Sequence, residues 1–251
     1  MTDTTQYLPR PAGERLAYRG LDGRRPTVLW LGGFRSDMAG TKAEALADWA
    51  RARGLGFLRF DYFAHGASSG DFKQGSITRW RDDALAVIDE LTQGPLVLVG
   101  SSMGGWIACL AAAVRPQRIA GLVLIAPAPD FTEALMRPSL PPQALKALAD
   151  QGVWTAPDDF GEGGYPITRL LLEDGARWSI LANPVPIRAP VRILQGGADT
   201  SVPWTHALEL AQVIEGQDVV FSLIKDGDHR LSRPQDLARL IAALEDLTAA
   251  T

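Results

Sequence analysis

The chain of 251 residues contains one serine whose sequence surroundings suit a nucleophile. Residues 100–104 are Gly-Ser-Ser-Met-Gly, which matches the pattern G-x-S-x-G with Ser102 at the central position. A β-branched run at 96–99 precedes the pattern and a helix-favouring run at 106–114 follows it. In this context the serine lies at the tip of a sharp strand-to-helix turn, where only glycine fits beside it. We therefore expect an exposed Ser102 hydroxyl, whereas Ser101 falls on an x position and points elsewhere.

A serine hydroxyl is a weak nucleophile and needs a base, most often histidine, to remove its proton. The chain has three histidines, His65, His206 and His229. His229 lies between the last expected strand and the last expected helix, where the order serine, acid, histidine of this architecture places the base. We expect His229 to be the base and expect loop-packing or surface roles for the other two. Asp226 and Asp228 are expected to shape its turn or to form solvated pairs.

The base in turn needs an acid that orients its ring and stabilises the imidazolium formed during the reaction. Asp199 follows the expected strand 191–195, at a carboxyl end, where open α/β sheets place their sites. Asp130 follows the expected strand 119–126 and is the competing acid. We favour Asp199.

Attack on a carbonyl creates an oxyanion, and losing one of the donors that meet it typically costs about 3 to 4 kcal/mol. The backbone N–H of Met103, directly after the nucleophile and at the helix start, is one expected donor. The second should come from residues 31–36, Leu-Gly-Gly-Phe-Arg-Ser, where glycines allow close approach of the backbone. We choose Phe34. The alternative is that this segment is a plain strand-to-helix connection.

We expect no cofactor and no metal site. The serine turn lacks the G-x-x-x-x-G-K pattern of a phosphate loop, and the histidines are too scattered for a ligand set. Cys109 is the only cysteine, so neither an intramolecular disulfide nor a Cys-based metal site can form. The formal net charge of −4 provides no whole-chain positive field, which argues against a nucleic-acid partner.

Short apolar runs alternate with helical stretches along the chain, as is typical of a mostly parallel sheet with crossover helices. The continuous apolar run 122–125 indicates a strand buried on both faces. The length and the 46% hydrophobic content fit a single α/β domain over residues 1–251. The expected strands are 27–31, 57–60, 96–100, 119–126, 191–195 and 219–224, and the expected helices are 41–53, 76–91, 104–114, 205–214 and 235–247.

This alternation breaks between residues 127 and 189, which are rich in proline and glycine. Only short helix-like pieces stand out there, at 143–150 and 168–173, and no convincing strand. Because the strand pattern resumes at residue 191, we interpret 127–189 as an inserted cap. Its large apolar side chains form either an acyl-chain or aromatic pocket or the cap's own core: Phe131, Leu135, Met136, Leu140, Trp154, Phe160, Tyr165 and Trp178.

Residues 91–114 carry no charge and are long enough to cross a bilayer as a helix. Pro95 and the glycines and serines of the turn interrupt the segment, so we expect a strand, a turn and a buried helix, and no membrane span. Residues 1–12 lack the apolar segment of a secretory signal, and one cysteine suits a reducing compartment. We therefore expect a cytoplasmic location.

From about residue 32 to 247 the chain resembles the α/β-hydrolase superfamily. Within it, the sequence is similar to the mitochondrial acyl-glucuronide esterase and S-depalmitoylase branch and its bacterial relatives. The resemblance implies hydrolysis of acyl esters or acyl thioesters, of small molecules or an acylated protein, with Ser102, Asp199 and His229 at the matching triad positions. Five separated strings carry it: 33–42 (Gly-Phe-Arg-Ser-Asp-Met, then Gly-Thr-Lys), 59–62, 100–106, 202–204 and 226–230.

Other functions use the same residues. A general short-chain carboxylesterase or a hydrolase of carbon–carbon bonds employs the same triad. A non-catalytic protein of this fold would use the serine turn only as a scaffold for binding a small molecule or partner. Since candidates for all three triad positions are present, we favour a serine hydrolase that works through an acyl-enzyme.

Overall fold

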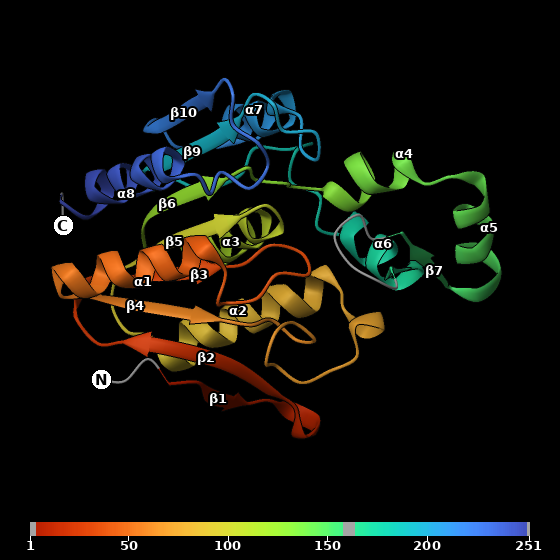
Figure 1. The fold of residues 1–251 in the computed structure, drawn as a ribbon, viewed down its shortest axis with the longest axis horizontal. Helices are drawn as coiled ribbons and strands as arrows, with labels where there is room; N and C mark the ends of the chain where they lie inside the picture. Colours follow the sequence, from red (N-terminus) through yellow and green to blue (C-terminus); the bar gives the residue numbers. More distant parts are fainter. Residues whose placement is uncertain (1–3, 158–163, 250–251) are drawn as a thin grey trace.

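The protein is built around an eight-stranded sheet (Figure 1), seen in a computed structural model that describes residues 4–157 and 164–249. The strand order is β1-β2-β4-β3-β5-β6-β9-β10. The six strands β4, β3, β5, β6, β9 and β10 run parallel, and β1 and β2 add an antiparallel edge. The α/β fold with a mostly parallel central sheet is therefore confirmed. The strands are β1 (Gln6–Pro9), β2 (Arg15–Leu21), β3 (Arg24–Leu31), β4 (Leu55–Phe60), β5 (Leu96–Ser101), β6 (Ile119–Ile125), β9 (Val191–Gly196) and β10 (Val219–Ile224).

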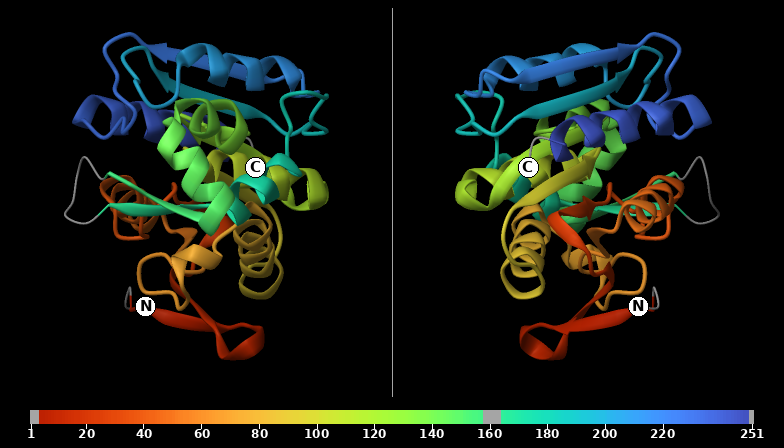
Figure 2. Two further views of the ribbon diagram at one scale, coloured as in Figure 1. Left: turned by 90° about the vertical axis from the view of Figure 1, so that its right-hand side faces the viewer. Right: turned by 90° about the vertical axis from the view of Figure 1, so that its left-hand side faces the viewer.

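Helices cover both faces of this sheet (Figure 2). One face carries α1 (Thr41–Arg53) and α8 (Pro234–Thr248), and the other carries α2 (Ile77–Leu91), α3 (Met103–Val114) and α7 (Trp204–Val213). Short helical turns lie at η1 (Pro11–Gly13), η2 (Phe72–Gln74) and η3 (Pro116–Arg118). Each helix layer encloses one apolar cluster against the sheet.

The central strands are apolar throughout because both of their faces are covered. In β5, Leu96 and Leu98 join the cluster under α2 and α3, whereas Val97 and Val99 join the cluster under α1 and α8. This alternation is the two-residue period of a strand, with an apolar layer on each side. The expectation that residues 122–125 are buried on both faces is likewise confirmed for β6.

Two strands precede the first one expected from the sequence. β1 pairs with β2, and β2 pairs with β4, both antiparallel, at the edge of the sheet. Of the residues in these two strands only Leu8, Leu16 and Ala17 are buried, so the strands lack the continuous apolar runs that mark the central strands. Pairing with β4 rather than local pattern decides that residues 15–21 form a strand.

Residues 127–189 are called the cap segment here, and their helices and hairpin, residues 132–176, lie beyond the carboxyl ends of the parallel strands (Figure 1). The two expected helices are present as α5 and α6, but the expectation of no strand is wrong, because β7 and β8 form an antiparallel hairpin. Each strand has only four residues, and Pro166 interrupts the second, so the sequence carried little strand signal. Treating the cap segment as an insertion in a single domain stays an interpretation. Its elements are η4 (Thr132–Met136), α4 (Arg137–Ser139), α5 (Pro142–Gln151), β7 (Val153–Ala156), β8 (Tyr165–Thr168) and α6 (Arg169–Ala176).

The uncharged stretch 91–114 forms the last residue of α2, strand β5, a turn and helix α3, as expected. Over residues 4–157 and 164–249, the structure contains no helix with the length and apolar character needed to cross a membrane.

Candidate active site

Ser102 lies at the tip of the turn between β5 and α3, in a backbone conformation that is costly for a residue with a side chain. Its φ is 54° and its ψ is −119°. Three hydrogen bonds hold this conformation: the Ser102 N–H donates to the Ile125 carbonyl at 2.9 Å, and its carbonyl accepts from Gly105 at 2.9 Å and from Ala128 at 3.1 Å. Hydrogen bonds to the neighbouring elements therefore hold the backbone of Ser102 in this strained conformation.

The glycines of this turn are required by close backbone approach. A Cβ on Gly100 would lie 2.3 Å from the Gly104 carbonyl oxygen, and a Cβ on Gly104 would lie 2.1 Å from the Leu31 carbonyl oxygen. Helix α3 can therefore begin directly against the ends of β3 and β5 only because these side chains are absent. The predicted strand, sharp turn and helix are confirmed.

The structure brings together the three side chains expected to act as nucleophile, base and acid. His229 Nε2 lies 3.1 Å from Ser102 Oγ, and His229 Nδ1 lies 2.8 Å from Asp199 Oδ2. A proton on Nδ1 that is donated to the carboxylate leaves Nε2 free to accept from the serine hydroxyl. The acid and the imidazole meet because β9 and β10 are neighbouring parallel strands, so the loops at their carboxyl ends lie side by side.

Asp199 is a buried carboxylate whose two oxygens both accept hydrogen bonds. Oδ1 accepts from the amides of Ser201 and Val202, both at 2.8 Å, and Oδ2 accepts from Gln195 Nε2 at 3.1 Å as well as from His229. Burial by itself raises the pKa of Asp199, but the hydrogen bonds from His229 and the two amides outweigh it, so its pKa is lowered. This environment favours the charged acid that an imidazolium partner needs.

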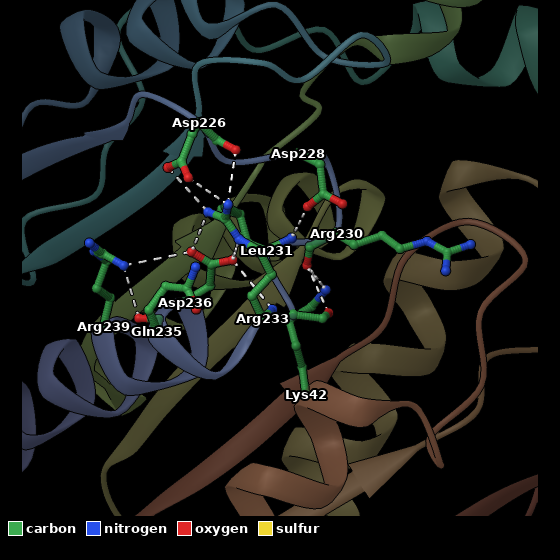
Figure 3. A network of polar contacts seen from close by, with 10 residues as sticks. Lys42, Asp226, Asp228, Arg230, Leu231, Arg233, Gln235, Asp236 and Arg239 are labelled. Atoms are coloured by element: carbon green, nitrogen blue, oxygen red, sulfur yellow. Dashed lines mark hydrogen bonds and ion pairs between the residues drawn. The ribbon is translucent and has the colours of Figure 1, made fainter.

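The loop that carries His229 is closed by its own acidic residues (Figure 3). Asp226 pairs with Arg233 at 2.7 Å across the base of the loop. Asp228 Oδ1 accepts the amide N–H of Leu231 at 2.9 Å and so shapes the turn after the histidine. The turn-shaping and ion-pair roles expected for these two aspartates are confirmed.

Lys42, from the first turn of α1, also reaches this loop (Figure 3). Its Nζ donates to the Arg230 carbonyl, one residue beyond His229. Burial lowers the pKa of Lys42 to about 8, although nearby Asp228 opposes that shift. This contact of Lys42 was not predicted from the sequence, because the residues of α1 do not indicate which loop the lysine side chain contacts.

The competing acid has a different set of partners. Asp130 Oδ2 accepts from the Ser179 hydroxyl at 2.6 Å, and its two oxygens also accept from the amides of Ile180 and Leu181. Asp130 therefore ties the two ends of the cap segment together, and Asp199 is the acid that contacts His229.

The two remaining histidines are both buried. His206 Nε2 lies 2.7 Å from the Pro129 carbonyl oxygen. The expected surface role of His206 is therefore wrong, because the face of α7 that carries it packs against the start of the cap segment. His65 packs within its loop, as expected, and its Nε2 lies 3.1 Å from the amide nitrogen of Arg35.

The two expected oxyanion donors come from neighbouring loops, because β3 and β5 are adjacent in the sheet. A Cβ built on Gly33 would lie 3.5 Å from the Ser102 Cβ, so the loop of residues 32–36, which we call the β3 loop, passes directly beside the serine. Within the part of the chain that the structure describes, the Phe34 and Met103 amides donate to no protein acceptor. Both N–H groups thus remain available to a further acceptor.

The large apolar residues of the cap segment serve mainly as packing. Phe131, Leu135, Met136 and Trp178 pack with the main core, and Met136, Leu140, Trp154 and Tyr165 pack with a small cap cluster. Phe131 and Tyr165 also contact the Phe34 ring, at centroid distances of 5.6 and 6.1 Å. Phe160 lies outside the described residues. The set is thus divided between the main core and the cap's own core, and two aromatic rings extend to the β3 loop.

The sheet order and the serine turn define a class of protein, the α/β hydrolases. A family model described as "Serine aminopeptidase, S33" matches residues 24–158. The chain belongs to this hydrolase family, within the α/β-hydrolase superfamily.

Particular relatives match nearly the whole chain. The rat protein named "Palmitoyl-protein thioesterase ABHD10, mitochondrial" is 36% identical over 245 residues, which is 97% of this chain and 82% of the rat protein. A crystal structure of a putative hydrolase from Agrobacterium vitis S4 has 41% identity and a TM-score of 0.93, covering 98% of both chains. Alpha/beta hydrolase domain-containing protein 10 from mouse has 35% identity and a TM-score of 0.89, covering 97% of this chain and 98% of its own.

The expected cytoplasmic location is contradicted by these relatives. The rat, bovine and human thioesterases that cover 96 to 97% of this chain are named as mitochondrial proteins. The composition of residues 1–12 argued against one export signal, but it does not distinguish among the other compartments.

Proposed function

We propose that this protein is a serine hydrolase that cleaves acyl esters or acyl thioesters through an acyl-enzyme, with Ser102 as nucleophile, His229 as base and Asp199 as acid. The observation that carries the proposal is the continuous hydrogen-bond chain from the Ser102 hydroxyl through His229 to the buried Asp199 carboxylate. Such a chain lets a weak nucleophile lose its proton at the moment of attack.

In the first half of the reaction, Ser102 Oγ attacks the acyl carbonyl while His229 Nε2 accepts its proton. Asp199 stabilises the imidazolium that forms, without taking a proton itself. His229 then returns the proton to the departing alcohol or thiol. In the second half, water attacks the acyl-enzyme with the same base, and the acid product leaves.

The amides of Phe34 and Met103 meet the oxyanion in both halves. They are backbone donors that are in place before the reaction begins, so little reorganisation is needed as charge develops on the carbonyl oxygen. Met103 is also the first residue of α3, where the positive end of the helix dipole faces the oxyanion.

An acyl thioester or long-chain ester is the favoured substrate class. A relative of 36% identity over 97% of this chain is named a palmitoyl-protein thioesterase, which supports this choice. The aromatic rings of Phe34, Phe131 and Tyr165 border the β3 loop and suit an apolar acyl group better than a highly charged one.

Labelling with a fluorophosphonate probe tests the nucleophile. The wild-type protein and Ser101→Ala should be labelled, and Ser102→Ala should not, since Ser101 lies buried in β5 and is not linked to His229. Labelling of Ser102→Ala at another residue, at the wild-type rate, would refute the assignment.

A substrate panel tests the class of reaction: p-nitrophenyl esters from acetate to palmitate, palmitoyl-coenzyme A and an acyl glucuronide. Highest kcat/KM on the long-chain ester or the thioester is expected. Turnover limited to short esters would favour a general carboxylesterase. A folded protein that neither reacts with the probe nor turns over any substrate would favour a non-catalytic binding protein.

A further inference from the structure

We propose that His65 is a positioning residue that orients the Phe34 amide toward the reacting carbonyl by holding the next amide of the β3 loop. This inference rests on the proposed function, because it concerns the donor assigned to the oxyanion. The His65 ring is hydrogen-bonded to Arg35 and Phe63 rather than to Ser102, His229 or Asp199, so it would act through the backbone of residues 32–36.

The hydrogen bonds of the His65 ring define its protonation state. Nε2 lies 3.1 Å from the amide nitrogen of Arg35, and Nδ1 lies 3.0 Å from the carbonyl oxygen of Phe63. A backbone N–H can only donate and a backbone carbonyl can only accept. The proton of the ring must therefore be on Nδ1, and Nε2 must be the acceptor. His65 is 3% exposed as a residue, and this burial lowers its pKa, which favours the neutral imidazole.

The amide that His65 accepts from lies in an unusual stretch of backbone. Arg35 has a φ of 59°, in the left-handed region that a residue with a side chain seldom occupies. On the other side of Phe34, the Gly33 carbonyl accepts from the Ser36 amide at 3.1 Å and from the Ser36 hydroxyl at 2.8 Å. The Phe34 N–H belongs to the peptide group of that same Gly33 carbonyl. With the Gly33 and Arg35 groups both bonded, the direction of the Phe34 N–H is determined.

Aromatic packing keeps the His65 ring in place. Trp80 and Phe72 contact it with centroid distances of 5.2 and 5.3 Å, and both also contact the Phe34 ring. The Trp80 indole N–H donates to the Phe63 carbonyl at 3.1 Å, the same oxygen that His65 Nδ1 contacts. Phe72 and Trp80 thus hold both the imidazole and the Phe34 side chain. Loss of the His65 acceptor should therefore change the orientation of the Phe34 backbone.

Substitution at His65 tests this role. His65→Leu keeps much of the volume but removes both hydrogen bonds, whereas His65→Gln retains an acceptor and a donor. His206→Leu is the matched control, because it removes another buried imidazole that is bonded to a carbonyl outside the β3 loop. The measurements are kcat and KM on a p-nitrophenyl ester, and the affinity for a trifluoromethyl ketone, whose adduct with a serine carries an oxyanion.

We expect His65→Leu to lower kcat by about 10- to 100-fold, less than complete loss of an oxyanion donor, with little change in KM. Affinity for the ketone should fall in parallel, and His65→Gln should recover most of both losses. His206→Leu should leave kcat near the wild-type value. Wild-type kcat in folded His65→Leu, an equal loss of kcat in His206→Leu, or no recovery in folded His65→Gln would overturn the role.

A measurement on the wild-type protein does not depend on how the variants fold. Nitrogen-15 NMR of the His65 ring should find the proton on Nδ1, with no change between pH 6 and 8. A proton on Nε2, or a charged ring in that range, would overturn the proposal. Absence of all turnover and probe labelling in the wild-type protein would instead refute the proposed function.

Discussion

Asp199 Oδ2 lies 2.8 Å from His229 Nδ1, although 30 residues separate the two in the chain. The carboxylate holds the imidazole with its second nitrogen toward Ser102, and replacement of Asp199 by Asn removes that preference for one tautomer. We expect Asp199→Asn to lower kcat by about 10⁴-fold, with little effect on KM. Steady-state kinetics on the preferred ester or thioester would measure this.

Asp130→Asn is the control for that variant. Asp130 contacts Ser179, Ile180 and Leu181 rather than His229, so the substitution should leave kcat near the wild-type value while weakening the cap segment. Equal losses of kcat in the two variants would show that the acid assignment is wrong.

The second prediction concerns the close approach of α3 to β3. A Cβ on Gly104 would lie 2.1 Å from the Leu31 carbonyl oxygen, a backbone atom that cannot move aside alone. Gly104→Ala should therefore lower the free energy of unfolding by about 3 kcal/mol or more, as measured by urea denaturation. In Gly40→Ala the new Cβ would lie 3.7 Å from the Asp37 carbonyl oxygen, and the free energy of unfolding should fall by only about 1 kcal/mol. Similar losses in both variants would argue against the steric explanation.

The third prediction is a pH dependence of stability that originates at Asp83. Burial raises its pKa from 3.8 to about 7, against the opposing hydrogen bond from the Phe63 amide and the nearby charges of Arg10 and Arg79. Between about pH 4 and 7 the folded chain keeps this proton and the unfolded chain loses it, so the free energy of unfolding falls as the pH rises.

Asp83→Asn removes this titration while its amide oxygen can still accept from Phe63. The variant should gain stability relative to the wild type as the pH rises across that window, by up to about 4 kcal/mol at pH 8 compared with pH 4. Urea denaturation at several pH values measures the difference. A constant difference between the two proteins would contradict the raised pKa.

The fourth prediction concerns the contact between the cap segment and α2. The Thr78 hydroxyl donates to Asp174 Oδ1 at 2.6 Å and accepts from the Trp178 indole at 2.7 Å, while the Thr78 amide donates to Asp174 Oδ2. Thr78→Val removes the hydroxyl partner of Asp174 Oδ1 and of the half-buried Trp178 indole, so it should destabilise the protein by about 1 to 3 kcal/mol.

Hydrogen exchange locates the effect of that change. Amides of α6 should exchange faster in Thr78→Val, whereas Thr78→Ser, which keeps the hydroxyl, should resemble the wild type. Unchanged exchange in α6, with faster exchange spread evenly over the sheet, would contradict a local role in holding the cap segment.

Local sequence was sufficient to predict several elements that position the site. The turn at Ser102 is encoded within a few residues, because its glycines are required where α3 approaches the ends of β3 and β5 this closely. The central strands were predictable because burial on both faces demands continuous apolar runs, as in β5 and β6. The edge strands β1 and β2 and the hairpin of β7 and β8 escaped prediction, because pairing with a neighbour rather than their own composition makes them strands.

By itself the sequence determined the α/β architecture, the serine turn and the short set of acids and histidines from which a catalytic chain could be drawn. Only the tertiary structure decided that Asp199 contacts His229 whereas Asp130 binds the cap segment, and that His65 and Lys42 support neighbouring loops. The physical reason is that strand and turn patterns depend on near neighbours along the chain. Hydrogen-bond partners depend instead on which strand ends lie side by side, and the order β3-β5-β6-β9-β10 exists only in the folded sheet.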